Sequence, residues 1–524
     1  MTEKDDLFLL INSLNRMERG YFSKYADIHA KGGENTYKRL FHLICTTENP
    51  SAELIRENFK GENLEMHVST AKNQLFHIIL RTMRSYGSEG SHFARANDLI
   101  RDTDLLNYRN LKSASKKALE RARNYAEENE LLISQLEILR RELQTLSRYP
   151  QQCTLEMYQN LRKRYYATSQ KIQMMFELEC AFIKLGMMRS RFTLVRHEKE
   201  RKELQQLIAE LPAIDERQTC VEAKTLYHLI MALTYKMQSD FLSAHYHFHR
   251  SLDLFHHKKD YSSMFPDNYL QVISGYIKTA IMLGKNKEAM HGLAILKRLH
   301  NQHPIFRSDK LKTELFFALS NYELMYFIEN SEYKKAKEQV NFLVIELPGF
   351  ENQLSASQRL ELYIRMSVAS LLNNDTRKAL QFLNRVYSEK FEHQHREFSG
   401  FCRVYYLLLH AEIGNKDHLY YAIRSIQRKL ERENNFGDAE KLLMKYFRSQ
   451  VLKGKRNSRE FQIEKFISEL FWLKSDPLFH YFDFYQWFCL KQGITPHHKE
   501  KNYKNRFNAL SSTAIPVAAE ARKE

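Results

Sequence analysis

The sequence has 524 residues, among them only 16 glycines and 9 prolines, and it carries a net charge of +17 at pH 7. Average usage of these two residues is about 7% and 5%, so the composition predicts long helices joined by short turns and excludes most glycine-rich phosphate-binding loops. The charge allows an acidic protein, a nucleic acid or an anionic membrane surface as a partner, without selecting one of them.

Residues 1–90 are predicted to form a helical bundle. Amphipathic segments at 7–30, 36–44, 52–59 and 64–86 each have the length and spacing of a helix, and we expect a break in the first near Gly20. A bundle at this position could act as an N-terminal cap that seals the first unit of a helical array. We favour this interpretation because the charge of the segment is nearly balanced.

The same segment allows a second interpretation. A short helix at 52–59, a turn at Lys60-Gly61 and a longer helix at 64–86 give the outline of a helix-turn-helix. In that case four polar or basic residues could contact a nucleic acid in its groove, namely His67, Lys72, Asn73 and Gln74.

From about residue 95 to about 450 the sequence predicts an array of helical hairpins. Ala114, Ala118 and Ala122 suggest a first close-packing stripe, and residues 155–211 read as long helices. Further on, small and aromatic residues alternate at helical spacing on both sides of short turns. One alanine after each turn recurs every 43 to 47 residues, at Ala244, Ala289, Ala336, Ala379 and Ala422. The fifth is the least regular, since two extra residues separate its turn from the alanine.

The order of residues within these units resembles the tetratricopeptide pattern of a small residue, an aromatic, a turn, an alanine and a second aromatic. The step is longer than the roughly 34 residues of a tetratricopeptide unit and falls in the range of HEAT-like repeats. The internal order favours tetratricopeptide-like units with lengthened helices. We therefore predict an all-α, helical-hairpin solenoid.

Three segments near the N-terminus carry a second resemblance: LNRMERGYF at 14–22, TYKRLF at 36–41 and KNQLFHIILRTMR at 72–84. They are similar to the N-terminal signature of an uncharacterised bacterial family of tetratricopeptide-like helical-repeat proteins. Asn15, Met17 and Gly20 depart from that signature. The resemblance implies an architecture and no activity.

Three histidines alternate along one predicted helix, at His245, His247 and His249. The first and third are one turn apart, a spacing that can chelate a metal, but the flanking sequence offers no third ligand. We expect no metal and place these side chains on the polar and intermediate faces of the helix.

The inner surface of the array is the candidate binding site. By analogy with tetratricopeptide geometry, the first helix of each hairpin lines this surface. The exposed inner positions are then expected to include Lys236, Ser274, Lys278, Asn321 and Glu361.

The two ends of the C-terminal region differ in composition. Residues 451–495 are rich in aromatic residues, including Trp472 and Trp487, and are predicted to cap the open end of the solenoid, with a protein-binding surface as the alternative. Residues 496–524 form a basic segment that is predicted to be disordered.

No catalytic motif stands out, and we expect neither an enzyme nor a cofactor. Six scattered cysteines, an acidic N-terminus and the lack of a long apolar window predict a cytoplasmic protein that does not insert into a membrane. We predict a scaffold or adaptor that binds another protein through an acidic or helical segment. The alternative is a nucleic-acid-binding regulator whose array acts as a sensor.

Overall fold

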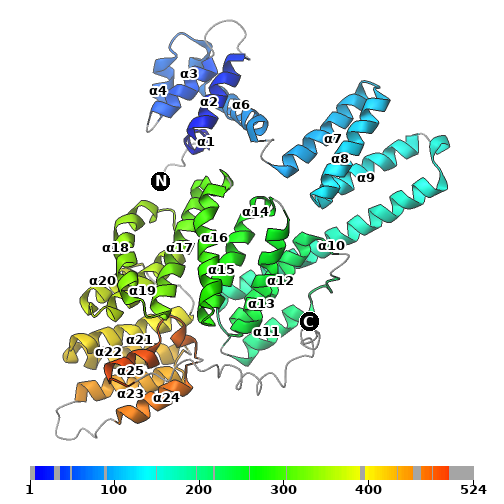
Figure 1. Ribbon diagram of the computed structural model, residues 1–524. Helices are drawn as coiled ribbons and strands as arrows, with labels where there is room; N and C mark the ends of the chain where they lie inside the picture. The colour runs from blue at the N-terminus through cyan, green and yellow to red at the C-terminus, as the bar shows by residue number, and fades with distance from the viewer. Residues whose placement is uncertain are drawn as a thin grey trace. The chain divides into compact units, whose positions relative to one another are not determined.

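The computed structural model describes most of the chain, in thirteen ranges. These are residues 6–28, 36–47, 50–87, 91–148, 150–195, 197–215, 219–258, 260–302, 304–389, 396–433, 435–452, 462–474 and 476–494. Every regular element in these ranges is a helix, which confirms the all-α prediction (Figure 1). Within them, no helix combines the length and apolarity that crossing a membrane requires. The predicted basic segment at 496–524 lies outside the described residues.

The chain divides into two compact units, and each is described by itself. The first unit comprises Met1–Phe176 with Thr219–Val221, and the second comprises Glu177–Gln218 with Glu222–Glu524. The boundary between the units falls inside the array predicted at 95–450. It lies within one long helix, α10 (Leu155–Arg191).

An N-terminal bundle opens the first unit. Its helices are α1 (Asp6–Ser13), α2 (Arg16–Ile28), α3 (Thr36–Thr46), α4 (Ala52–Asn58), α5 (Asn63–Met66) and α6 (Val68–Gly87). Helix α6 contacts each of the other five. Phe22 and Phe41 meet in its fully buried core with ring centroids 4.3 Å apart.

Two breaks in this bundle differ from the expected ones. The first helix breaks at Asn15 and not at Gly20, since the Asn15 side chain accepts hydrogen bonds from the backbone of Met17 and Glu18 and caps α2. The segment predicted as one helix at 64–86 is interrupted at His67, whose backbone leaves the helical region with φ −128°.

Three further helices follow in the first unit: α7 (His92–Tyr108), α8 (Lys112–Glu128) and α9 (Leu132–Arg148), before the short η2 (Pro150–Gln152) and α10. The predicted alanine stripe of α8 is wrong in its register. Ala114 is exposed and Ala118 half-buried, whereas the buried stripe consists of Ser115, Ala122 and Ala126.

The second unit consists of the C-terminal part of α10 and of α11 to α25. Its helices are α11 (Glu198–Ala209), α12 (Val221–Met237), α13 (Phe241–His257), α14 (Tyr261–Met264), α15 (Pro266–Met282), α16 (Asn286–Gln302), η3 (Pro304–Arg307), α17 (Asp309–Glu329), α18 (Tyr333–Phe350), α19 (Ala356–Leu372), α20 (Thr376–Ser388), α21 (Arg396–Ile413), α22 (Lys416–Arg432), α23 (Asp438–Leu452), α24 (Ile463–Trp472), η5 (Pro477–His480) and α25 (Phe484–Lys491). Helix α15 packs on α13, α16 and α17, and α17 packs on α18 and α19.

Five hairpins of this unit close with the same turn. Two residues before each second helix stands a residue with φ between 59° and 81°: Ser239, Gly284, Ser331, Asn374 and Gly414. The next backbone N–H donates to the carbonyl five residues earlier, as from Asp240 to Tyr235 at 3.0 Å and from Glu332 to Phe327 at 2.8 Å. This is the Schellman motif, which satisfies the last carbonyls of the first helix.

The predicted alanines occupy one position relative to this turn. Ala244, Ala289, Ala336 and Ala379 are each the fourth residue of a second helix, and each is fully buried. In α22 the fourth residue is Leu419, which is buried, whereas Ala422 lies a turn further on and is half-buried. The prediction for the fifth alanine is therefore wrong by three residues. Helix α22 begins two residues after its turn residue, as in the other hairpins, so its fourth residue is Leu419 and not Ala422.

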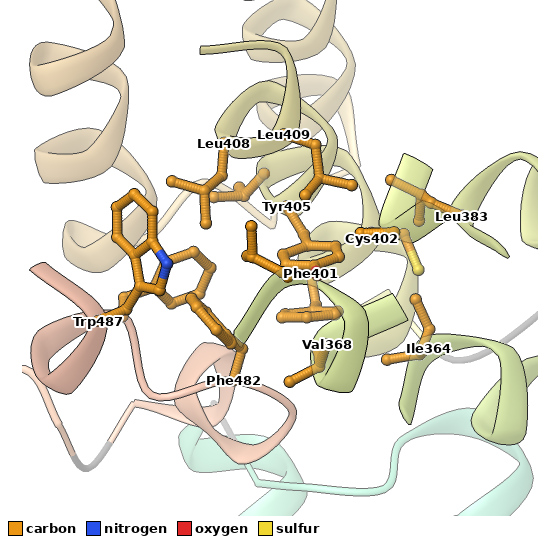
Figure 2. Close-up of a cluster of buried hydrophobic side chains, with 14 of the residues drawn as sticks. Ile364, Val368, Leu383, Phe401, Cys402, Tyr405, Leu408, Leu409, Phe482 and Trp487 are labelled. Atoms are coloured by element: carbon orange, nitrogen blue, oxygen red, sulfur yellow. The ribbon is translucent and has the colours of Figure 1, made fainter. Parts of the chain in front are cut away.

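The aromatic C-terminal segment joins the core of the second unit. Figure 2 shows Phe401 and Tyr405 of α21 between Phe482 and Trp487 on one side and Ile364 on the other. The two tryptophans differ, since Trp487 is buried whereas Trp472 is 60% exposed. The segment thus contributes to the core of α19 to α23 and leaves one large aromatic side chain on the surface.

The surroundings of Gly275 in α15 show how closely neighbouring helices approach. A Cβ atom at Gly275 would lie 2.2 Å from the ring of Phe248 on α13, and that ring is fully buried. Gly186 of α10 is also inside a helix, but a Cβ there would meet nothing within 4 Å.

These two glycines give a matched test of the packing. We expect Gly275→Ala to destabilise the protein by about 1–3 kcal/mol, because overpacking outweighs the better helix propensity of alanine. Gly186→Ala should stabilise it by up to about 1 kcal/mol. Thermal or urea unfolding of both variants measures the difference. Equal effects would contradict the close approach of α13 and α15.

Candidate functional site

The five predicted inner residues come together on one face of the second unit. Lys236 lies on α12, Ser274 and Lys278 on α15, Asn321 on α17 and Glu361 on α19. The prediction that these positions are exposed is wrong, because four of them are half-buried between neighbouring helices and Asn321 is buried. The charges of Lys236, Lys278 and Glu361 act on one another, although these residues are separated by tens of positions in the sequence. We call this group of side chains the inner cluster.

Helical periodicity explains why these positions share a face. Relative to the left-handed turn residue of its own hairpin, Lys236 lies three residues earlier, Lys278 six, Asn321 ten and Glu361 thirteen. Intervals of three and four residues return to the same side of an α-helix. The four residues therefore lie on the same side of their first helices, at increasing distances from the turn.

Three further residues complete the inner cluster, and the sequence reasoning missed them. They are Arg189 in the last turn of α10, Tyr322 next to Asn321, and Arg365 one turn after Glu361. The hydroxyl of Ser274 interacts with that of Tyr322, and the charges of Arg189, Glu361 and Arg365 act on the same phenol. An arginine inside the apolar run LYIRMSVASLL is the signal that could have identified Arg365.

The lysine side chains of the inner cluster lie in surroundings that exclude most of the solvent. Burial lowers the pKa of Lys236 well below its usual value, and the positive charges of Lys278 and Arg189 lower it further. Burial also lowers the pKa of Lys278, although Glu361 opposes that shift. Burial lowers the pKa of Arg189 as well. The site therefore holds cations in surroundings that solvate them poorly.

Glu361 is the anion among these cations. Burial disfavours its charge, but Lys278 and Arg365 attract it more strongly, so its pKa lies below the usual value. Its Oε1 atom accepts a hydrogen bond from Nδ2 of Asn321 at 3.2 Å and lies 3.8 Å from Nη2 of Arg365. The carboxylate side chain is still 27% exposed, so the cluster is open on this side.

The charges of the inner cluster do not balance. Arg189, Lys236, Lys278 and Arg365 contribute four basic groups, and Glu361 contributes one acidic group. A poorly solvated excess of positive charge is costly unless an anion compensates it. The chemistry of the cluster thus suits an acidic ligand.

The three alternate histidines lie in the same unit, and the structure corrects one of them. His245 is buried and not on a polar face: its Nδ1 lies 2.9 Å from the Thr279 hydroxyl and its Nε2 lies 2.5 Å from a Glu288 carboxylate oxygen. His249 is half exposed, with its Nδ1 2.9 Å from Asp253. Within the described ranges, no three His, Cys, Asp or Glu residues gather as metal ligands.

His247 contacts a second histidine. Its Nδ1 lies 2.9 Å from Nδ1 of His228 on α12, and its ring stacks on Tyr235. Burial lowers the pKa of His228 to about 4, with a smaller effect of Arg250 and Lys224. Burial lowers the pKa of His247 to about 3, with a smaller effect of His228. Both rings are therefore neutral at physiological pH.

The residues of the nucleic-acid interpretation lie in the first unit. His67 is exposed between α5 and α6, Asn73 and Gln74 are exposed on α6, and Lys72 is half-buried. Gln74 already accepts a hydrogen bond from the hydroxyl of Tyr37. Because Lys72, Asn73 and Gln74 are consecutive in the helix, they do not share one face of α6.

A cavity of about 330 Å³ also lies in the first unit, lined by residues of α8, α9 and α10. Two of its basic side chains are paired with glutamates. Arg123 and Arg164 both contact Glu142, at 3.2 Å and 3.0 Å, and Arg164 also contacts Glu127. The arginines of this cavity are thus closer to charge balance than the basic groups of the inner cluster.

Comparison of the chain with protein-family models, with curated proteins and with solved structures finds no match.

The lysines predict a stability gain on removal of charge. We expect Lys236→Met to raise the free energy of unfolding on the order of 1 kcal/mol, because an apolar side chain avoids the cost of a poorly solvated cation. The gain should shrink as the pH rises towards 10.5, the usual lysine pKa, because wild-type Lys236 then loses its proton in both states. Lys334→Met, at an exposed position of α18, is the control and should change stability by less than about 0.5 kcal/mol. A lower melting temperature for Lys236→Met would contradict the argument.

The histidine pair predicts a dependence on pH. Between about pH 6.5 and 4 the unfolded histidines bind protons that the folded pair does not, so stability should fall as the pH falls. We expect His247→Phe to reduce this loss by on the order of 2 kcal/mol between about pH 7 and pH 5. Urea unfolding at each pH measures it, with the half-exposed His249→Phe as the control. An unchanged pH profile in His247→Phe would exclude the pair as the cause.

Proposed function

We propose that this protein is a non-enzymatic interaction scaffold whose inner cluster binds an acidic segment of another protein. In this proposal the hairpins of the second unit form a tetratricopeptide-like solenoid with lengthened helices, and the aromatic C-terminal segment closes its end. The first helices α12, α15, α17 and α19 line the receiving surface. The roles of residues 1–90 as a cap or as a helix-turn-helix stay predictions.

The observation that carries the proposal is the meeting of basic side chains from several successive hairpins. Lys236, Lys278 and Arg365 come from three different first helices, and Arg189 comes from α10. Their common surroundings lower the pKa values of Lys236 and Lys278. A single hairpin could not assemble this group, so the arrangement of the helices creates it.

An acidic segment suits this surface for two physical reasons. Its carboxylates would offset the repulsion among the basic groups, and complementary potential speeds the encounter of the two molecules. Ser274, which is half-buried, adds a hydroxyl that can donate a hydrogen bond to a peptide backbone or accept one from it. An extended or helical segment can reach several hairpins at once.

The proposal predicts the effect of removing two charges from the surface. We expect the double variant Lys236→Gln, Lys278→Gln to bind a capped, fluorescein-labelled oligoglutamate peptide at least about tenfold more weakly than wild type, since two ionic contacts are lost. Glutamine is preferred to glutamate at these positions because a new carboxylate would lie beside Glu361. Fluorescence anisotropy gives the dissociation constants.

Two comparisons make this experiment specific. The double variant Lys334→Gln, Lys337→Gln removes the same charge from exposed positions of α18, a second helix, and should retain binding. An increase of ionic strength from about 0.05 to 0.5 M shortens the screening length about threefold and should weaken the wild-type complex. Equal binding by both double variants would exclude the inner cluster. Partner capture from the native cell that nuclease treatment abolishes would favour the nucleic-acid alternative.

A further inference from the structure

One arginine of the inner cluster lacks the partners that a buried arginine needs. The Arg365 residue is only 2% exposed, yet its Nε and Nη2 atoms are buried without any hydrogen-bond partner. The Oδ1 atom of Asn321, which is 1% exposed, is in the same condition. Buried polar atoms are nearly always hydrogen-bonded, and an exception calls for an explanation.

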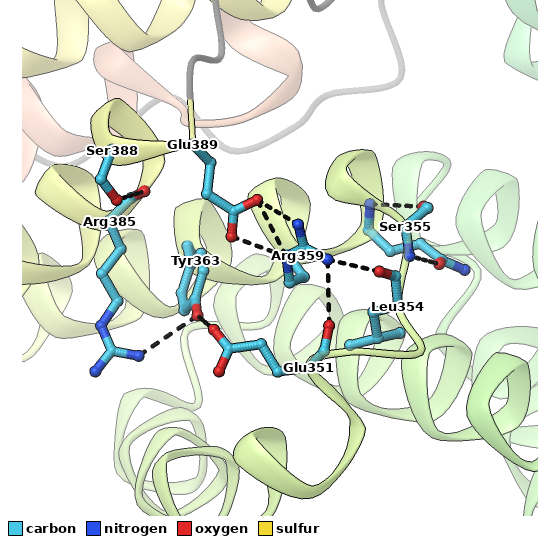
Figure 3. Close-up of polar contacts among 9 residues, drawn as sticks. Glu351, Leu354, Ser355, Arg359, Tyr363, Arg385, Ser388 and Glu389 are labelled. Atoms are coloured by element: carbon cyan, nitrogen blue, oxygen red, sulfur yellow. Dashed lines mark hydrogen bonds and ion pairs between the residues drawn. The ribbon is translucent and has the colours of Figure 1, made fainter. Parts of the chain in front are cut away.

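The same helix contains an arginine that meets this requirement. Arg359 donates from Nε and Nη2 to the carboxylate of Glu389, at 2.8 Å and 2.7 Å, as Figure 3 shows. Its Nη1 atom donates to the carbonyls of Glu351 and Leu354. In the first unit, Arg141 pairs with Asp104 through the same two nitrogens, at 2.9 Å and 2.7 Å.

Arg359 and Arg141 thus each hold a carboxylate through the Nε–Nη2 edge. Two parallel N–H groups on this edge match the two oxygens of a carboxylate. Arg359 and Arg141 use it while their side chains are 22% and 21% exposed. In Arg365, whose side chain is only 3% exposed, neither nitrogen of this edge has a hydrogen-bond partner.

Glu361 does not complete this edge. Its Oε1 lies 3.8 Å from Nη2 of Arg365, beyond hydrogen-bonding distance, and instead accepts from Asn321 at 3.2 Å. A glutamate four residues earlier on the same helix approaches the arginine from one side only. The charge of Arg365 is therefore partly balanced, but its two N–H groups are not.

We propose that the Nε–Nη2 edge of Arg365 is the receptor for one carboxylate of the bound acidic segment. The incoming carboxylate takes two hydrogen bonds from Arg365 and an ionic contact from Lys278, whose charge acts on the same site. Glu361, whose side chain is partly exposed, turns away from the arginine to admit it. This inference rests on the proposed function and adds the residue that selects a planar carboxylate.

The experiment separates this role from a structural one by measuring binding and stability together. Arg365→Met should bind the capped oligoglutamate peptide at least about tenfold more weakly while its melting temperature stays equal to or above that of wild type. Arg365→Lys keeps the charge without the two-nitrogen edge and should lose most of the same affinity. Arg359→Met should show the reverse, with a lower melting temperature and retained affinity. Glu361→Gln should bind the peptide more tightly, since it removes the competing charge.

The peptide probes distinguish the sources of the anion. An oligoglutamine peptide with a blocked C-terminus should not bind; binding by its free-carboxylate form would assign the edge to a chain terminus. Tighter, Arg365-dependent binding of an oligo-phosphoserine peptide would overturn the carboxylate assignment. Unchanged affinity in Arg365→Met, combined with loss in the Lys236→Gln, Lys278→Gln variant, would overturn this inference and leave the proposed function standing. No binding of oligoglutamate to wild type at low ionic strength would overturn both.

Discussion

The close approach of neighbouring helices is the constraint on which the second unit depends. A left-handed residue ends the first helix of each of the five hairpins, and in four of them a buried alanine in the first turn of the second helix lets the two backbones approach. Between hairpins, Gly275 leaves room for the ring of Phe248. These contacts fix how far apart the first helices lie and how they are rotated. The inner cluster follows from that spacing, because its side chains come from different first helices.

The left-handed position of the turn disfavours most residue types, and different residues occupy it in the five hairpins. Glycine adopts the left-handed region at little cost and occupies it at Gly284 and Gly414. Asn374 tolerates it better than most residues, whereas Ser239 and Ser331 adopt it at a cost of about 1–2 kcal/mol. The hydrogen bond that closes each turn and the burial of the residues behind it compensate for that cost. The common geometry thus comes from packing and is not tied to one amino acid.

Under the proposed function, the uncompensated cations of the inner cluster lower the stability of the free protein and favour an acidic ligand. A buried cation without full compensation weakens the folded state, and an anion that compensates it gains affinity from the same energy. Arg359 and Arg365 illustrate the two outcomes within one helix. The first is saturated by Glu389 and backbone carbonyls, and it joins α19 to the end of α20 (Figure 3). In Arg365 the Nε and Nη2 atoms have no hydrogen-bond partner. Buried polar groups that lack partners at a site lined by several helices are expected where a ligand completes the structure.

The sequence by itself determined the helical class, the positions of the five hairpins and four of their buried alanines, because these depend on local periodicity and turn chemistry. By analogy with tetratricopeptide geometry it also placed Lys236, Ser274, Lys278, Asn321 and Glu361 on one face, where the structure brings them together, but it did not predict that Asn321 is buried. It missed the cap at Asn15, the start of α22, the burial of His245 and the empty edge of Arg365. Each of these depends on which atoms stand opposite a side chain, and residues far away in the sequence supply them. Only the tertiary structure therefore decided that Arg359 has a carboxylate opposite its two nitrogens and that Arg365 has none.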